Sequence, residues 1–267
     1  MSLSTPRRLA GASAISVVAV MVAGGPPLAG QAATPREIPN MAGKILTVMG
    51  PIDPAELGST LMHEHIFIDF QNPVARAAIS RATDLGLHLA PVTLETLSGV
   101  RYRGVPNRDN LYLTDLGEAI KEVMEFKRRG GGAIVDTTSI GLGRDPQALV
   151  QVAGATGLQI VMGAGWYQKQ FHPADMDRRT VEELTDVIVR DITVGAEGTP
   201  VRSGIIGEIG VDGNPLTENE MKSIRAAARA SRMTGAAVTF HRGGNGEEKF
   251  RVLDAMVAEG ADLRRVI

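Results

Sequence analysis

The stretch "TLMHEHIFIDF", residues 60–70, places two histidines one residue apart in an otherwise apolar run. Side chains at positions i and i+2 of a β-strand point to the same face, so His63 and His65 share a face and Glu64 points to the other. We interpret the run as a buried strand whose paired imidazoles hold a divalent metal ion. The alternative is a pair of hydrogen-bonded core histidines. The helical zincin pattern is excluded, because it needs histidines four residues apart.

Outward from this strand, apolar β-rich runs alternate with amphipathic helical patterns. The further strands are expected at residues 131–140, 158–167, 203–211, 235–243 and 263–267, with helices at 113–130, 144–157, 180–195 and 217–235. Such alternation predicts parallel strands joined by crossover helices. Because no dinucleotide-type glycine fingerprint follows the first strand, a (β/α)8 TIM barrel is favoured over a doubly wound sheet. About six of the eight βα units are present.

Several local signals set the expected boundaries. Thr114, Thr180 and Thr217 are expected to cap three of the helices, the last two with a glutamate three residues on. Residues 43–58 predict a short β-hairpin with its turn at Gly50-Pro51, and residues 99–114 a long polar insertion. In residues 141–145, Arg144 and Asp145 are expected to pair with each other or to cap the next helix.

The N-terminal segment has a different composition. Arg7 and Arg8 precede an apolar run and then small residues, with no acidic residue, which is the order of a secretory signal peptide. We therefore predict a signal peptide over residues 1–32, a linker over 33–42 and the barrel over 43–267. The paired arginines suggest a twin-Arg signal, and the protein is expected to be exported, periplasmic or extracellular. An uncleaved membrane anchor is the alternative.

Composition limits the partners and the metal ligands. The net charge is −2 and the chain contains no cysteine. A basic face for nucleic acid is therefore not indicated, and no membrane contact is expected after signal cleavage. Without thiolates, a metal must be held by His, Asp, Glu or a modified Lys. A small-molecule substrate is the expected partner, and a homodimer is left open.

Two further residues belong to the predicted metal site. Glu208 lies in the very apolar run "SGIIGEIGV", where a buried carboxylate must be paired or must bind a cation. A salt bridge to a neighbouring arginine is the alternative. His241 ends the run "GAAVTFH", at the carboxyl end of its strand, where barrel active sites lie.

Other polar and aromatic residues are assigned by their position. Trp166 and Tyr167 end the third strand and are expected to form a wall of the substrate pocket, with core packing as the alternative. Asp136 ends the second strand and could orient a ligand histidine, or act as a capping or loop residue. His88 and His172 lie in polar, loop-like context and are taken as surface residues.

The motifs "TVMGPI", "GSTLMHEH", "IVDTTSIGLGRD", "GAGWY", "TVEELTDVIVRDI", "SGIIGEIG" and "AAARASRMTGAAVTFH" occur in the order and approximate spacing of the phosphotriesterase family. The chain resembles the phosphotriesterase-related branch of that family, within the amidohydrolase superfamily, from residue 43 to residue 267. The resemblance implies a (β/α)8 barrel with two divalent ions, with zinc expected. His63 and His65 match the ligands of the more buried ion, Glu208 the bridging acid that positions the hydroxide, and His241 a ligand of the second ion.

The sequence departs from the family in two respects. The fourth strand carries Glu208 where better-known phosphotriesterases have a carboxylated lysine, so small esters, lactones or amides are expected substrates rather than phosphotriesters alone. The chain is also expected to stop short of a second-metal histidine and of the general-base aspartate, with its C-terminal part missing. The resemblance implies a metal-dependent hydrolase that attacks an ester, lactone, amide or phosphoester bond with a metal-bridging hydroxide. The alternative is a truncated, non-catalytic fragment that binds metal weakly or not at all.

Overall fold

The computed structural model describes residues 38–71, 82–102, 106–241 and 246–267. Every element below belongs to one compact unit, which ends at Ile267. The predicted signal peptide and the first part of the predicted linker lie outside the described residues. No helix of the described part is long and apolar enough to cross a membrane.

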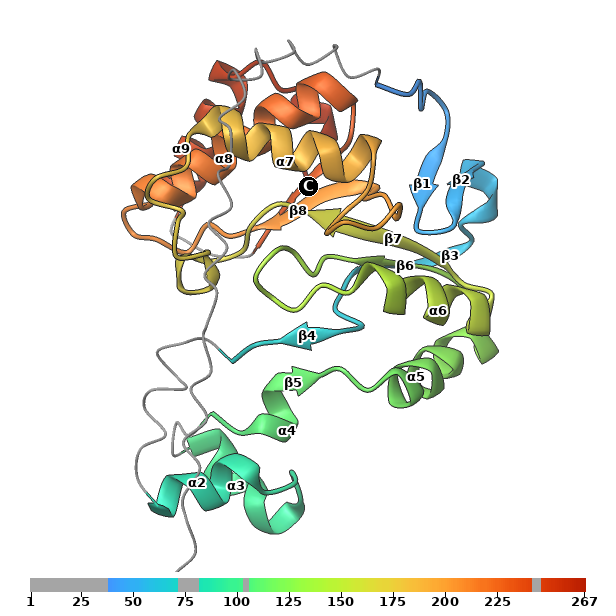
Figure 1. Cartoon of the computed structure of the whole chain (residues 1–267), viewed down its shortest axis with the longest axis vertical. Coiled ribbons are helices and arrows are strands. Elements are labelled where there is room, and N and C mark those ends of the chain that lie inside the picture. Colours follow the sequence, from blue (N-terminus) through green and yellow to red (C-terminus); the bar gives the residue numbers. More distant parts are fainter. Residues whose placement is uncertain (1–37, 72–81, 103–105, 242–245) are drawn as a thin grey trace, which may run out of the picture. The chain divides into compact units, whose positions relative to one another are not determined.

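Five parallel strands form a curled sheet in the order β3 (Ser59–Glu64), β6 (Gly131–Asp136), β7 (Gln159–Ala164), β8 (Ile205–Ile209) and β9 (Val238–Phe240) (Figure 1). Val266 continues this order through a parallel bridge to Val238. Each step between strands contains a helix: α5 (Leu116–Arg128), α6 (Pro146–Thr156), α7 (Val181–Thr193), α8 (Glu218–Thr234) and α9 (Gly246–Ala258). The predicted α/β class is therefore confirmed, as a parallel half-barrel with crossover helices.

A hairpin and an insertion flank the first barrel strand. Strands β1 (Ile45–Thr47) and β2 (Gly50–Ile52) pair antiparallel, and the 3-10 turn η1 (Pro54–Glu56) follows. The turn predicted at Gly50-Pro51 is wrong, because Gly50 pairs with Thr47 and the chain reverses at residues 48–49. The Thr47 hydroxyl donates to the Gly50 carbonyl at 2.8 Å and closes this turn.

The predicted polar insertion is partly helical. After β4 (Ile68–Asp69) come α2 (Ala82–Leu89), α3 (Leu94–Tyr102) and α4 (Arg108–Leu111), and then β5 (Tyr112–Leu113), which returns to pair antiparallel with β4. Two stretches of this segment, 72–81 and 103–105, are outside the described residues. The other short helical turns are η2 (Lys169–Phe171) and η3 (Leu263–Arg265).

Helix starts follow the expected capping chemistry at most positions. Thr180 and Thr217 each form a capping box with the glutamate three residues on, as predicted. The N-cap of α5 is Asp115, whose carboxylate accepts from the Glu118 N–H at 2.9 Å, so the prediction of Thr114 is wrong by one residue. Asp145 caps α6.

Replacing Thr180 by alanine is expected to lower the free energy of unfolding by about 1 kcal/mol. The substitution leaves the Glu183 N–H at the start of α7 without its side-chain acceptor, which lies 3.2 Å away. Thr180→Ser keeps the hydroxyl and is the control. Urea unfolding of both variants measures the difference, and equal loss in the two would show that the cap contributes nothing.

The apolar core lies between the helices and the sheet. Its largest cluster joins α7 and α8 to the inner strands and contains the fully buried side chains Leu184, Ile188, Ile206 and Ile209. Strand β3, by contrast, was predicted to be buried and is mostly exposed, with Met62 54% accessible. The physical reason is its position, because among the described strands β3 pairs only with β6 and forms the sheet edge.

Candidate metal centre

Three histidines surround one buried carboxylate. Glu208 is 1% exposed. Its Oε2 lies 2.8 Å from His63 Nε2 and 2.9 Å from His241 Nδ1, and its Oε1 lies 3.2 Å from His65 Nε2. Ligand atoms of His63, His65 and Glu208 all lie within 4.8 Å of one another. The structure thus brings together the four residues that the sequence analysis assigned to a metal site.

The topology explains why residues so distant in sequence meet. His63 is on β3, His65 directly follows it, Glu208 is on β8 and His241 directly follows β9. These strands are parallel, so their carboxyl ends share one edge of the sheet, where barrel proteins place their active sites. Backbone hydrogen bonds set the register: Glu208 N donates to the Thr137 carbonyl at 3.0 Å, and His241 N donates to Ile209 at 2.9 Å.

The electrostatics favour an ionised glutamate. Burial raises the pKa of Glu208, but hydrogen bonds and charge from His65 and His241 outweigh burial and hold this pKa below its ordinary value. An ionised carboxylate surrounded by imidazoles is a set of nitrogen and oxygen donors of the kind that divalent metal ions prefer. The residues present therefore fit a divalent cation.

A second buried carboxylate supports the backbone beside the histidines. Asp136, 1% exposed, accepts from Ile66 N at 2.8 Å and from Thr138 N at 3.1 Å. It thereby ties the residue after His65 to the end of β6. Burial raises the pKa of Asp136, against hydrogen bonds from these two residues. The hydrogen bonds found for this carboxylate are thus to backbone N–H groups on either side of the site, and the orienting role of Asp136 stays a prediction.

The two aromatic residues predicted to line a pocket lie in different places. The Tyr167 hydroxyl lies 3.0 Å from His241 Nδ1, and burial together with the Glu208 charge raises its pKa. Trp166 is completely buried in the cluster under α7 and α8. Trp166 therefore follows the alternative of core packing, and its prediction as a pocket wall is corrected, because its side chain is completely buried in this cluster.

Two other predicted positions are also corrected, and one residue was missed. His88 and His172 are partly buried, and their rings contact the carbonyl oxygens of Pro106 and Tyr167. Burial lowers the pKa of His172. Asp212 was not singled out, although its Oδ1 lies 3.7 Å from His241 Nε2. Its place four residues after Glu208, just past a strand end, was the available signal.

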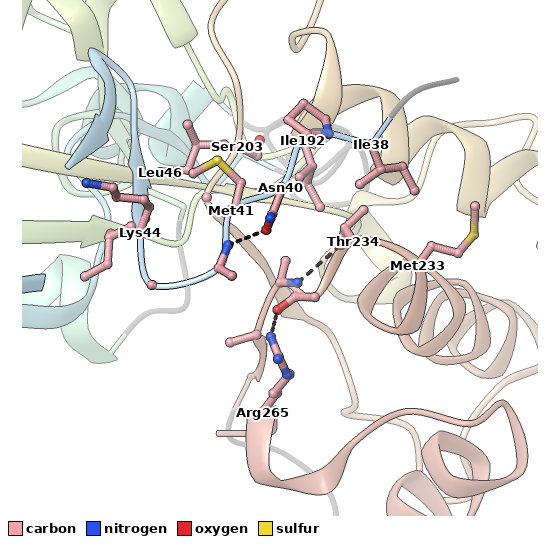
Figure 2. Close-up of a pocket in the computed structure, with 18 residues that line it drawn as sticks. Ile38, Asn40, Met41, Lys44, Leu46, Ile192, Ser203, Met233, Thr234 and Arg265 are labelled. Carbon is pink, nitrogen blue, oxygen red and sulfur yellow. Dashed lines mark hydrogen bonds between the residues drawn. The ribbon is translucent and has the colours of Figure 1, made fainter. Parts of the chain in front are cut away.

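Two cavities of the described part are not lined by Glu208. One of about 630 Å³ is lined by residues 38–46 and by Ser203, Thr234 and Arg265, at the amino ends of β8 and β9 (Figure 2). That is the end of the sheet opposite the histidines. The other, of about 570 Å³, lies beside β3 and includes His65 among its lining residues. The candidate metal centre is therefore recognised from the close approach of its ligand atoms and not from a cavity.

A parallel α/β sheet that gathers histidines around a buried carboxylate at its carboxyl edge is the arrangement of metal-dependent barrel proteins. The chain belongs to the phosphotriesterase family, whose family model matches residues 43–267. Solved structures of this family are TIM barrels, in agreement with the half-barrel observed here.

Individual relatives support this assignment. The chain is 38% identical to an N-acetyltaurine hydrolase of Xenopus tropicalis over 85% of its length and 64% of that protein. A resiniferatoxin-binding protein from Rhodobacter sphaeroides shares 41% identity with a TM-score of 0.76, over 87% of this chain and 63% of that one. A lactonase from Listeria monocytogenes shares 26% identity with a TM-score of 0.65, over 84% and 64%. The chain thus spans slightly less than two thirds of the length of these proteins.

Proposed function

We propose that this chain carries the metal-binding half of a hydrolase active site that cleaves a small-molecule substrate with the help of two divalent ions, zinc being the expected metal. The observation that carries the proposal is the Glu208 carboxylate, 1% exposed and within 2.8–3.2 Å of nitrogens of three histidines. A buried ionised carboxylate must be paired with a positive charge or bind a cation, and a divalent ion held by the three imidazoles would meet this need.

The residues have distinct roles in this proposal. His63 and His65 would hold one ion, His241 the other, and Glu208 would be their shared carboxylate ligand. Divalent ions bound there would lower the pKa of a coordinated water to near neutrality and polarise the scissile group. Tyr167, whose hydroxyl contacts His241, would hold that imidazole in place at the rim of the site. Asp212 would lie next to the same imidazole.

An amide is the substrate class that the relatives favour. Vertebrate relatives at 34–38% identity are named N-acetyltaurine hydrolases, and the bond cleaved in such a substrate is an N-acyl amide. We therefore propose hydrolysis of small N-acyl amides. A lactone is the second candidate, supported by the structural likeness to the Listeria lactonase. Export through residues 1–32 stays a prediction.

The metal content of the purified chain tests the proposal. Elemental mass spectrometry is expected to find about two divalent ions per chain, and the double variant His63→Asn, His65→Asn is expected to lose at least one. His88→Asn, whose ring contacts a backbone carbonyl instead of Glu208, is the matched control and is expected to keep the metal. Stoichiometric metal absent from the wild-type chain, or retained in the double variant, would contradict the proposal.

A substrate panel tests the proposed bond type. N-Acetyltaurine and other N-acyl amides, lactones, carboxyl esters and phosphotriesters are offered to metal-loaded protein, with and without a chelator. Amides are expected to be cleaved fastest, and the chelator is expected to abolish the activity. Hydrolysis that survives metal removal would refute the metal-dependent mechanism.

A further inference from the structure

Thr138 lies between two groups of the segment that directly follows β3. Its hydroxyl Oγ1 is 3.0 Å from the Phe67 carbonyl oxygen and also 3.0 Å from Nδ1 of His65. The residue is 1% exposed, and its N–H is held by Asp136 at 3.1 Å. Water therefore has little access to the hydroxyl, and both contacts must be explained by the protein's own hydrogens.

Counting hydrogens assigns the proton on His65. A threonine hydroxyl carries one hydrogen, and a carbonyl oxygen carries none. The contact with Phe67 is a hydrogen bond only if the hydroxyl donates to that carbonyl, because otherwise two acceptors would face each other. Oγ1 is then left with lone pairs toward the imidazole. Nδ1 of His65 must therefore carry a hydrogen and donate it to Thr138.

This assignment determines which nitrogen is available to a metal. With the hydrogen on Nδ1, the neutral imidazole has its lone pair on Nε2, and this atom lies 3.2 Å from Glu208 Oε1. In a neutral His65 of this kind, the Nε2 lone pair and the Glu208 carboxylate are both acceptors, so a cation between them would satisfy both. His63 has no such partner among the described contacts of its ring, since its Nε2 contact is with Glu208 itself.

We propose that Thr138 is a positioning residue for the metal centre, which selects Nε2 of His65 as the metal-facing nitrogen by accepting a hydrogen bond from Nδ1. The inference rests on the proposed function and deepens it, since Thr138 touches neither the expected metal nor a substrate. Asp136 supports this contact, because its carboxylate accepts from the N–H of Thr138 and from the N–H of the residue after His65.

The test is zinc affinity of the full chain in Thr138→Val and Thr138→Ser. Valine keeps the branched shape without the hydroxyl, and loss of such a partner is expected to weaken zinc binding about 10- to 100-fold. Serine keeps the hydroxyl and is expected to restore wild-type affinity. Thr137→Val is the matched control, because the Thr137 hydroxyl contacts the Glu64 carbonyl and no histidine.

A spectroscopic measurement gives a second readout. In the zinc-loaded wild-type chain, a ¹H–¹⁵N spectrum of the imidazoles is expected to show a slowly exchanging Nδ1 hydrogen on His65, assigned by its loss in His65→Asn. Thr138→Ser is expected to keep this signal and Thr138→Val to lose it. The wild-type spectrum alone decides the proton position if the valine variant does not fold.

The outcomes separate the two proposals. Wild-type protein that binds no zinc would overturn the proposed function and this inference together. Zinc binding that is equal in wild type and Thr138→Val, or a His65 hydrogen found on Nε2, would overturn the role of Thr138 and leave the proposed function standing.

Discussion

Replacing Glu208 by glutamine is expected to remove metal from the chain and to lower hydrolysis of the best substrate by at least about 1000-fold, which corresponds to roughly 4 kcal/mol of transition-state stabilisation. The amide has almost the same shape as the carboxylate, so packing is retained. It carries no charge, however, and one of its two oxygen acceptors becomes an NH₂ donor. Both carboxylate oxygens contact imidazole nitrogens, so the NH₂ group would face an imidazole in either orientation of the amide.

The expected loss is large because Glu208 is the shared partner of the cluster. His63 and His241 approach one of its oxygens and His65 approaches the other, within 2.8–3.2 Å. No other described carboxylate takes part in a group whose donor atoms come this close together with those of His63 and His65. The remaining histidines would be neutral ligands without an anion to balance the metal charge.

Elemental analysis and steady-state kinetics of Glu208→Gln measure the effect. Glu64→Gln is the matched control, because Glu64 is on the same strand as His63 but is exposed and is not part of the candidate metal group. It is expected to keep both metal and activity. Wild-type metal content in Glu208→Gln would show that the carboxylate is not a ligand, and an equal loss in Glu64→Gln would indicate a general effect of charge.

Replacing Arg144 by methionine is expected to lower the free energy of unfolding by about 3–5 kcal/mol. Arg144 and Asp145 were expected to pair with each other or to cap the next helix, and Asp145 does cap α6. The Arg144 guanidinium donates to Asp191 at 2.9 Å, to the Gly163 carbonyl at 2.9 Å and to Glu197 at 3.1 Å. The side chains of Arg144 and Asp191 are each 1% exposed. Methionine fills much of the volume but leaves a buried carboxylate without its cation.

The loss is expected to depend on pH in a definite direction. Burial raises the pKa of Asp191 even with Arg144 opposing it, and without the guanidinium the pKa will rise further. The folded variant therefore binds a proton more tightly than the unfolded chain, whose aspartate has a pKa of about 3.9. The stability that the variant loses at neutral pH therefore returns as the pH falls through the raised pKa of Asp191. The difference between wild type and Arg144→Met should shrink below neutral pH.

Denaturant unfolding at several pH values provides the measurement. In the double variant Arg144→Met, Asp191→Leu both charges are gone, so a much smaller loss is expected than in Arg144→Met alone. Arg129→Met breaks a solvent-exposed pair with Glu125 and is expected to cost far less than Arg144→Met. Equal losses for Arg144→Met and the double variant would show that the buried carboxylate is not the cause.

Much of the fold could be predicted because its signals are local. Capping boxes at Thr180 and Thr217 involve residues three apart, and strand runs are recognised from a few consecutive apolar residues. Two of the errors were local as well. The hairpin turn shifted from Gly50-Pro51 to residues 48–49, because the Thr47 hydroxyl closes it there. The Thr114 cap shifted by one residue, because the carboxylate of Asp115 reaches the free N–H.

The sequence by itself determined which residues could form the metal site, because paired histidines in a strand and a glutamate in an apolar run are chemically unusual. Only the tertiary structure decided their partners. Thr138 lies 73 residues from His65, and Asp191 lies 47 residues from Arg144. Likewise, Trp166 and Tyr167 are neighbours in sequence, yet one is in the core and the other contacts His241. Strand register and helix packing set these contacts, and both depend on interactions between segments that no short stretch of sequence contains.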